Sequence, residues 1–286
     1  RGSEIDQMLR FLPGKRALFS ASPDGTPVVF RQYYDDSGMQ QAKNQWSELN
    51  RVYGYLDKPP YRINAPLHMN QEHRVLVVER VQGRPLLNHM KKLDADDRLF
   101  LTGEAVRWLR AYTQPSEDNS PARVNSWVAR AADASARQPH RKLRDLETLA
   151  LAKMQDLAEQ ITGRVWRKAI CHGDFHPNNL LVSNDALIGI DIGGLDRIPI
   201  YKDMARFMVH MARRNMLPSG RRRYGVDGAT FEEFAVVFGL NGTEIELFVP
   251  FMIGFEILFR VEQKQLDARR VGYAEQMTLG WLQDVD

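Results

Sequence analysis

The chain has 286 residues and a formal net charge of +3 at pH 7, and 43% of its residues are hydrophobic. These values are typical of a globular protein with one large or two smaller domains, and they exclude a disordered or collagen-like chain. The small charge gives no reason to expect a nucleic-acid partner. A single cysteine excludes an internal disulfide and favours a reducing, cytoplasmic location. The longest nearly apolar segment, residues 247–259, is shorter than the roughly 20 residues of a membrane helix, so no membrane partner is expected.

The first third of the chain is predicted to form strands and one helix. Residues 16–22 and 27–34 alternate as strands do, and the Pro-Asp-Gly-Thr sequence between them is typical of a hairpin turn. Residues 39–56 carry apolar side chains at helical spacing. Residues 73–81 form another short apolar strand, which Gly83 and Pro85 end. These elements predict a small sheet-rich unit over residues 4–81.

The rest of the chain, residues 82–286, is predicted to be mainly helical. Helical periodicity is present at 94–113, around 121–138, at 143–163 and again from 203 to the end, with an interruption at 217–228. Between the two helical regions, residues 180–182 and 187–190 flank a turn and predict a β-hairpin. The expected fold class is therefore α+β, with a smaller sheet-rich part followed by a larger helical part.

The segment "ICHGDFHPNNLLV" at 170–182 concentrates the residues that could perform chemistry, and Asp191 follows the predicted hairpin. The candidates in this segment are Cys171, His172, Asp174, His176, Asn178 and Asn179. Their types are compatible with three kinds of site: a zinc site, a cysteine nucleophile, or a magnesium and phosphate site.

The spacing opposes the first two kinds. His172 and His176 are four apart, but Gly173 and Pro177 oppose the continuous helix that would bring two such histidines to one face. Cys171 is adjacent in sequence to His172, and neighbours in sequence rarely have the geometry of a nucleophile and its base. Cys171 also continues an apolar run, as a buried cysteine does.

The third kind of site fits. In the protein-kinase catalytic loop a base and a metal-binding Asn are five positions apart. Asn179 follows Asp174 at that distance, and Asp191 is followed two residues later by Gly193, as in a D-x-G magnesium motif. A polar turn that only caps the strands is the alternative for this segment.

The segments "HGDFHPNNLLV" and "IDIGGLDRIPIYKDMA" resemble the aminoglycoside phosphotransferase and choline kinase superfamily. The resemblance is dense over about residues 170–207 and implies a bilobal, protein-kinase-like fold. It implies that Asp174 is the catalytic base and that Asn179 and Asp191 are magnesium ligands. It also implies that Asp203 braces the catalytic loop from a buried position.

A kinase also needs a cation on an N-terminal strand, paired with an acid from the next helix. Arg31 and Glu48 are the candidates, and an exposed Arg and a solvated Glu are the alternative for them. The resemblance implies that the backbone of Glu79 and Val81 binds adenine. Only one glycine, Gly14, lies where a glycine-rich loop is expected.

The acceptor is expected to be a small molecule, because only residues 192–202 separate Asp191 from Asp203 and leave no room for a peptide-docking segment. The arginines of "GRRRYG", residues 220–225, form either a solvated loop or part of a site for an anionic acceptor.

The sequence thus predicts an ATP- and Mg²⁺-dependent phosphotransferase that acts on a hydroxyl of a sugar, an amino alcohol or an aminoglycoside-like acceptor. The alternative is a pseudokinase of the same fold that binds nucleotide without turnover. The sequence gives no oligomeric state.

Overall fold

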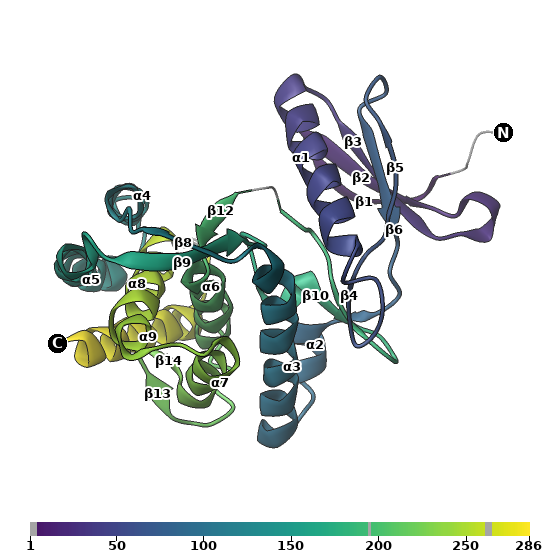
Figure 1. Ribbon diagram of the computed structural model, residues 1–286. Helices are drawn as coiled ribbons and strands as arrows, with labels where there is room; N and C mark the ends of the chain where they lie inside the picture. The colour runs from purple at the N-terminus through teal and green to yellow at the C-terminus, as the bar shows by residue number, and fades with distance from the viewer. Residues whose placement is uncertain (1–4, 194–195, 261–264) are drawn as a thin grey trace. The chain divides into compact units, whose positions relative to one another are not determined.

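A computed structural model describes residues 5–193, 196–260 and 265–286 (Figure 1). By internal contacts the chain divides into two compact units. The first comprises residues 1–91 and 178–196, and the second comprises residues 92–177 and 197–286. The first is rich in sheet and the second in helix, so the predicted fold class is confirmed. Residue 4, where the first unit was expected to begin, lies outside the described residues. The hairpin at 180–189 groups with the N-terminal sheet and not with the helices.

The main sheet of the first unit has five strands in the order β1-β2-β3-β6-β5, and all of its neighbouring strands are antiparallel. Three of them were predicted, namely β2, β3 and β6. The bounds are β1 Ile5–Leu12, β2 Arg16–Ala21, β3 Val28–Tyr33, β5 Pro66–Asn70 and β6 Val75–Glu79. A short 3-10 turn, η1 Pro23–Gly25, joins β2 to β3. Strands β1 and β5 were not predicted, because their side chains are mostly exposed or only partly buried.

Helix α1, Asp36–Tyr53, lies against one face of this sheet (Figure 1). The side chain of Asp35 accepts a hydrogen bond from the Gly38 amide and caps the helix, which therefore begins three residues before the predicted start. The buried face of α1 includes the apolar Ala42 and Leu49, and it also includes Gln45 and Glu48. Two polar side chains thus face the interior, where each needs a partner.

The predicted hairpin joins a second, four-stranded sheet of the first unit, in the order β4-β11-β10-β7. Its bounds are β4 Tyr61–Ile63, β7 Arg84–Pro85, β10 Leu180–Val182 and β11 Leu187–Gly189, with the short helix α2 Leu86–Met90 after β7. Strand β11 pairs with β10 in antiparallel and with β4 in parallel orientation. This pairing fixes the residues that precede β10 and follow β11.

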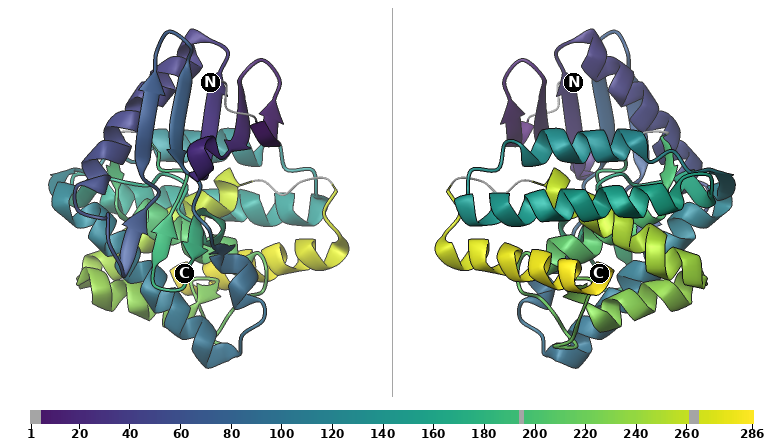
Figure 2. Two further views of the ribbon diagram at one scale, coloured as in Figure 1. Left: turned by 90° about the vertical axis from the view of Figure 1, so that its right-hand side faces the viewer. Right: turned by 90° about the vertical axis from the view of Figure 1, so that its left-hand side faces the viewer.

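The second unit is built from long helices, among which α5 lies between α4 and α9 and packs against both (Figure 2). The bounds are α3 Ala95–Thr113, α4 Asn125–Ser135, α5 Arg141–Ile161, α6 Tyr201–Ala212, α7 Gly228–Phe238, η4 Glu244–Phe248, α8 Val249–Phe259 and α9 Ala268–Val285. The apolar segment at 247–259 is a buried helix, as predicted: residues 249–258 of α8 are all buried. Trp281 of α9 donates a hydrogen bond to the Pro250 carbonyl at 2.9 Å.

Short strands complete the second unit. A three-stranded sheet has the order β12-β9-β8, and a small hairpin pairs β13 with β14. The bounds are β8 Asp118–Pro121, β9 Val165–Ile170, β12 Arg197–Pro199, β13 Arg222–Arg223 and β14 Val226–Asp227, with 3-10 turns η2 Gln114–Ser116 and η3 Pro177–Asn179. Strand β9 leads directly into the segment that begins at Cys171.

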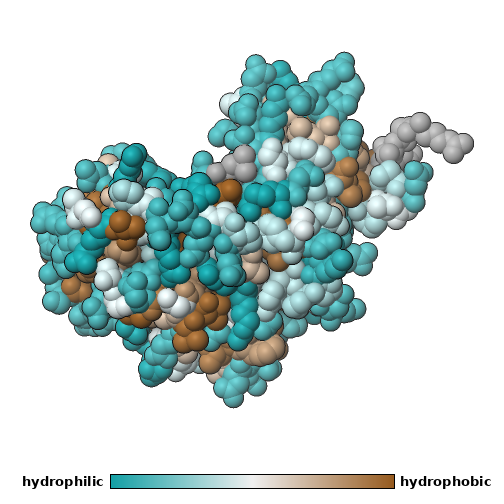
Figure 3. All heavy atoms as spheres, viewed as in Figure 1, coloured by the Kyte–Doolittle hydropathy of each residue, from teal (hydrophilic) through white to brown (hydrophobic). Residues whose placement is uncertain are grey.

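Hydrophilic residues cover most of the face drawn in Figure 3, interrupted by smaller hydrophobic areas. Among the described residues no helix is both long and apolar enough to cross a bilayer.

Candidate active site

Cys171 and His172, the first two candidates after β9, are buried among side chains of the second unit. Cys171 is 3% exposed, and its Sγ lies 3.6 Å from the Ile198 carbonyl oxygen, to which it donates. His172 is 1% exposed and lies between the rings of Trp108, Tyr112 and Phe175. Its Nδ1 accepts a hydrogen bond from the Asp174 amide at 3.4 Å. Cys171 is therefore buried as expected, and His172 orients the segment through the Asp174 amide.

Gly173 turns the chain toward Asp174. Its φ of +83° lies in the left-handed region, which glycine adopts at little cost. The Gly173 amide donates to Oδ2 of Asp203 at 3.0 Å, and its carbonyl accepts from Nζ of Lys202. Asp203 is fully buried in the first turn of α6. Lys202 and Asp203, consecutive residues of α6, thus bind the carbonyl and the amide of Gly173 and hold the loop in place.

Asp174 is surrounded by positive and polar groups. Its Oδ1 accepts hydrogen bonds from Nε of Arg206 at 2.8 Å and from Nη2 of Arg260 at 3.0 Å, and its Oδ2 lies 3.5 Å from Nε2 of His176. Burial by itself raises the pKa of the Asp174 carboxyl group, but the hydrogen bond from His176 and the charge of Arg206 outweigh it and hold that pKa well below its usual value. Asp174 is therefore a carboxylate at neutral pH.

Glu256 of α8 lies close to the same cations. Its carboxylate is fully buried, 3.6 Å from Nζ of Lys202, 3.9 Å from Nε of Arg206 and 3.5 Å from Nε of Arg260. The two oxygens of Glu256 have no hydrogen-bond partner among the described residues. The carboxylate therefore balances the charge of the cations from the interior without using their donor groups.

His176 stacks on His210 of α6, with ring centroids 4.6 Å apart. Burial, followed by the charge of Arg214, lowers the pKa of His210 well below its usual value, so this ring is neutral. A neutral ring beside His176 holds the latter next to Asp174 without adding charge.

In the first unit, Arg31 of β3 is nearly buried and contacts the predicted magnesium ligand Asp191. Its Nη2 lies 3.1 Å from Oδ1 of Asp191, and its Nη1 lies 3.5 Å from Oε1 of Gln45, to which it donates. The expected partner Glu48 uses both carboxylate oxygens to bind Arg51, at 2.7 Å each. Gln45, three residues earlier on the same face of α1, therefore takes the position that the sequence analysis assigned to Glu48. Because Gln45 is neutral, Asp191 is the acid that balances the charge of Arg31.

Asn179 and Asp191 lie at the same end of the β10–β11 hairpin. Leu180 pairs with Gly189, and the Ile190 amide donates to the Asn179 carbonyl at 2.9 Å, so Ile190 lies opposite Asn179 and Asp191 is the next residue along the chain. Asp191 has a φ of +57°, which Asp tolerates better than most residues, and its side chain is 44% exposed. A carboxylate and an amide are oxygen ligands of the kind that Mg²⁺ prefers, so these residues fit that ion.

Glu79 is the last residue of β6, and Val81 follows two positions later. The side chain of Glu79 is engaged within the first unit: Oε2 accepts from Nη2 of Arg62 at 2.6 Å and from the Ala65 amide at 3.0 Å. This side chain stabilises the end of the strand. The expectation that the backbone here binds adenine stays a prediction.

The predicted residues thus form two groups. Arg31 contacts Asp191 in the first unit, which also contains Asn179, and Asp174 with its arginines lies in the second. Gln45, Arg206, Arg260 and Glu256 were not among the predicted residues. The signal available for Glu256 was a single acid in a helix that is otherwise apolar on every face.

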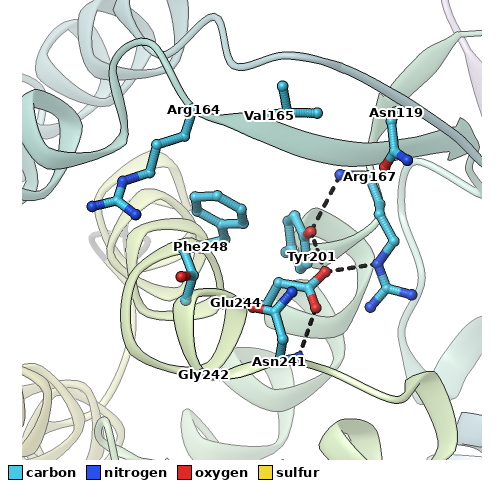
Figure 4. Close-up of a pocket in the computed structure, with 10 residues that line it drawn as sticks. Asn119, Arg164, Val165, Arg167, Tyr201, Asn241, Gly242, Glu244 and Phe248 are labelled. Atoms are coloured by element: carbon cyan, nitrogen blue, oxygen red, sulfur yellow. Dashed lines mark hydrogen bonds and ion pairs between the residues drawn. The ribbon is translucent and has the colours of Figure 1, made fainter.

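A cavity of about 720 Å³ in the second unit contains none of these residues (Figure 4). Its lining includes a network around Glu244, whose Oε1 accepts from Nε of Arg167 at 2.7 Å and from the hydroxyl of Tyr201 at 2.6 Å. Burial and the hydrogen bond to Glu244 raise the pKa of Tyr201 well above its usual value. The network joins residues of β9, α6 and η4.

The family of the chain follows from a comparison with protein-family models. The model of the phosphotransferase enzyme family matches residues 26–238, which is more than half of the chain and includes Asp174, Asn179 and Asp191. The chain belongs to this family. A comparison with curated proteins gives no match.

Several solved structures of small-molecule kinases have a similar fold, although their sequence identity to this chain is low. The spectinomycin phosphotransferase APH(9)-Ia, in complex with ADP and spectinomycin, has a TM-score of 0.61 and 11% identity, covering 98% of this chain and 94% of that chain. The amicoumacin kinase hAmiN, in complex with AMP-PNP, Ca²⁺ and Ami, has a TM-score of 0.57 and 10% identity, covering 98% and 89%. The Plasmodium vivax ethanolamine kinase has a TM-score of 0.51 and 11% identity, covering 96% and 81%. These likenesses confirm the predicted kinase-like fold.

Proposed function

We propose that this phosphotransferase transfers the γ-phosphate of ATP to a hydroxyl group of a small molecule, with Mg²⁺ as the metal. The observation that carries the proposal is the ion pair of Arg31 with Asp191 at 3.1 Å, at the hairpin end where the Asn179 carbonyl accepts from the amide of Ile190, the residue before Asp191. Two oxygen ligands next to a guanidinium suit a magnesium-bound polyphosphate.

Each residue has a role that follows from its chemistry. The Asp174 carboxylate accepts the hydrogen bond of the acceptor hydroxyl, orients it and takes its proton. Arg31 binds the oxygens of the phosphates that are not transferred. Asn179 and Asp191 hold Mg²⁺, which neutralises the phosphate charge when it is bound. Positioning and charge neutralisation then supply most of the rate enhancement.

A small-molecule acceptor is supported by the short connection between Asp191 and Asp203 and by the relatives. The similar structures are named as kinases of spectinomycin, amicoumacin and ethanolamine. All three names describe a kinase or phosphotransferase of a small molecule, so the same reaction class is proposed here.

The test is an ADP-release assay with Mg-ATP and a panel of sugars, amino alcohols and aminoglycosides. We expect at least one acceptor to raise ADP release above the acceptor-free rate. Asp174→Ala should abolish that increase, and Asp191→Asn should raise the Mg²⁺ concentration needed for half-maximal rate. Asp185→Asn, at the exposed turn of the same hairpin, is the control and should behave as the wild type. Tight binding of Mg-ATP without transfer to any acceptor would refute the enzyme and establish the pseudokinase.

A further inference from the structure

We infer that the acceptor carries a negatively charged group, such as a carboxylate or a phosphate, and that Arg206 and Arg260 bind this group beside the reacting hydroxyl. The inference rests on the proposed kinase function and names the acceptor class of that site. It is carried by the convergence of two guanidinium groups on the catalytic carboxylate, at 2.8 and 3.0 Å from one oxygen of Asp174.

The two arginines keep unused donors next to Asp174. A guanidinium has five N–H donors. Among the described residues, hydrogen bonds use only Nε of Arg206 and only Nη2 of Arg260. The side chains are 10% and 33% exposed, and that of Asp174 is 48% exposed. An acceptor that reaches Asp174 therefore also reaches guanidinium groups, which bind carboxylate and phosphate with charge-assisted hydrogen bonds.

The charges around Asp174 favour an anion over a cation. Glu256 is fully buried and lies behind the cations, at distances of 3.5–3.9 Å from them, so it offsets their charge without offering an exposed oxygen to a ligand. An ammonium group placed beside the reacting hydroxyl would face Arg206 and Arg260 directly. Such like-charge contacts cost affinity. The site is therefore unsuited to a polycationic acceptor.

The other candidate for an anion site was the basic loop at 220–225, and its arginines are engaged elsewhere. Arg221 pairs with Glu232 at 3.4 Å. Arg222 donates to the Gly225 carbonyl at 2.8 Å, and Arg223 lies 4.5 Å above the Phe231 ring. These contacts stabilise the loop itself, which supports Arg206 and Arg260 as the anion-binding residues.

The first arm of the test does not need turnover. Sodium chloride is replaced by sodium sulfate at constant ionic strength, and the melting temperature is followed for the wild type, Arg206→Gln, Arg260→Gln and the control Arg221→Gln. Sulfate stabilises proteins in general, so the difference between variants is the readout. We expect the wild type and Arg221→Gln to gain an additional, saturable increase that Arg206→Gln and Arg260→Gln lose. Equal increases in all four proteins would overturn the inference.

The second arm measures acceptor selectivity. Acceptors are compared in sets that share one carbon skeleton: glucose, glucosamine and glucuronate, and then a polyol with its amino alcohol and its hydroxy acid. We expect the highest kcat/KM for the anionic member. Losing one charge-assisted hydrogen bond should reduce the anion-to-neutral ratio by about 10-fold or more in Arg206→Gln and Arg260→Gln. Arg221→Gln should leave the ratio unchanged.

A higher kcat/KM for the neutral or ammonium member, or an unchanged ratio in both arginine variants, would refute the anionic acceptor and leave the kinase intact. If no member accepts phosphate, the proposed kinase function fails, and the sulfate arm alone decides whether Arg206 and Arg260 form an anion site. Arg260→Gln is included because Arg206 is nearly buried and its replacement alone can affect folding.

Discussion

Replacing Glu256 by Gln should destabilise the second unit, because three cations then lose a buried counter-charge. Glu256→Gln keeps the shape of the side chain and removes only its charge. At an effective dielectric constant of about 20, an ion pair at 3.6 Å is worth roughly 4–5 kcal/mol before desolvation. Most of that attraction offsets the cost of burying both ions. Arg260 is 33% exposed, so solvent screens its share.

The net loss depends on how well the remaining acids compensate the cations. Removing one partner of a buried ion pair costs about 3–5 kcal/mol when the other ion is left unpaired. Lys202, at 6% exposure, still has Asp203 at 3.8 Å, so the lower end of this range applies. We expect a loss of about 3 kcal/mol. For a protein of this size that corresponds to a decrease of roughly 6–12 °C in the melting temperature.

Tryptophan fluorescence is a suitable probe because Trp108, Trp127, Trp166 and Trp281 belong to the second unit. The control is Glu232→Gln, which removes an exposed partner of Arg221 and should change the melting temperature by no more than about 1 °C. A melting temperature for Glu256→Gln within about 1 °C of the wild type would refute the reasoning. A higher one would mean that desolvation of Glu256 exceeds its attraction to the cations.

Three further outcomes are expected. Asp174→Asn should lower kcat by about 10²–10⁴-fold with little change in the KM for ATP, as measured by steady-state ADP release. The folded-state pKa of Asp174 lies below its ordinary value of 3.8, so its ionic contribution to stability should be complete at neutral pH and decline only as the pH falls below about 4. The difference in melting temperature between the wild type and Asp174→Asn should therefore stay constant above about pH 4 and shrink below it. Gly254→Ala should destabilise by about 1–3 kcal/mol in urea unfolding, because the added Cβ would lie 2.5 Å from Cζ2 of Trp281, and Trp281→Phe should recover part of this loss.

Much of the fold was predictable because its main elements have strong periodic patterns. Helix α1 and strands β2, β3 and β6 bury one face or both, and the spacing of their apolar residues follows from that burial. Strand β1 was not predictable in this way, since Ile5, Met8, Leu9 and Phe11 are exposed although they are apolar. Strands β4 and β12 have three residues each, too few for any period to be visible.

The partner of Arg31 shows where periodicity loses its resolving power. Gln45 and Glu48 are three residues apart on a helix, so both belong to the same buried face of α1. Glu48 was the predicted partner because an acid is the usual partner of a strand cation. Which of the two contacts Arg31 depends on the position of each along α1 relative to β3. It also depends on Arg51, which lies on the next turn and binds Glu48 itself.

The surroundings of Asp174 were not predictable from the catalytic segment, because they come from two distant parts of the chain. Asp174, Asn179 and Asp191 are recognised by local spacing, whereas Arg206 and Arg260 approach from α6 and from the end of α8. The presence of an acid in α8 has a physical explanation. Lys202 is buried and Arg206 is nearly buried, and both need a negative charge that solvent does not supply. Glu256 provides it from inside an otherwise apolar helix. The guanidinium donors of Arg206 and Arg260 that do not bind Asp174 can therefore remain available to a ligand, which links the stability of the helical core to the acceptor that the site selects.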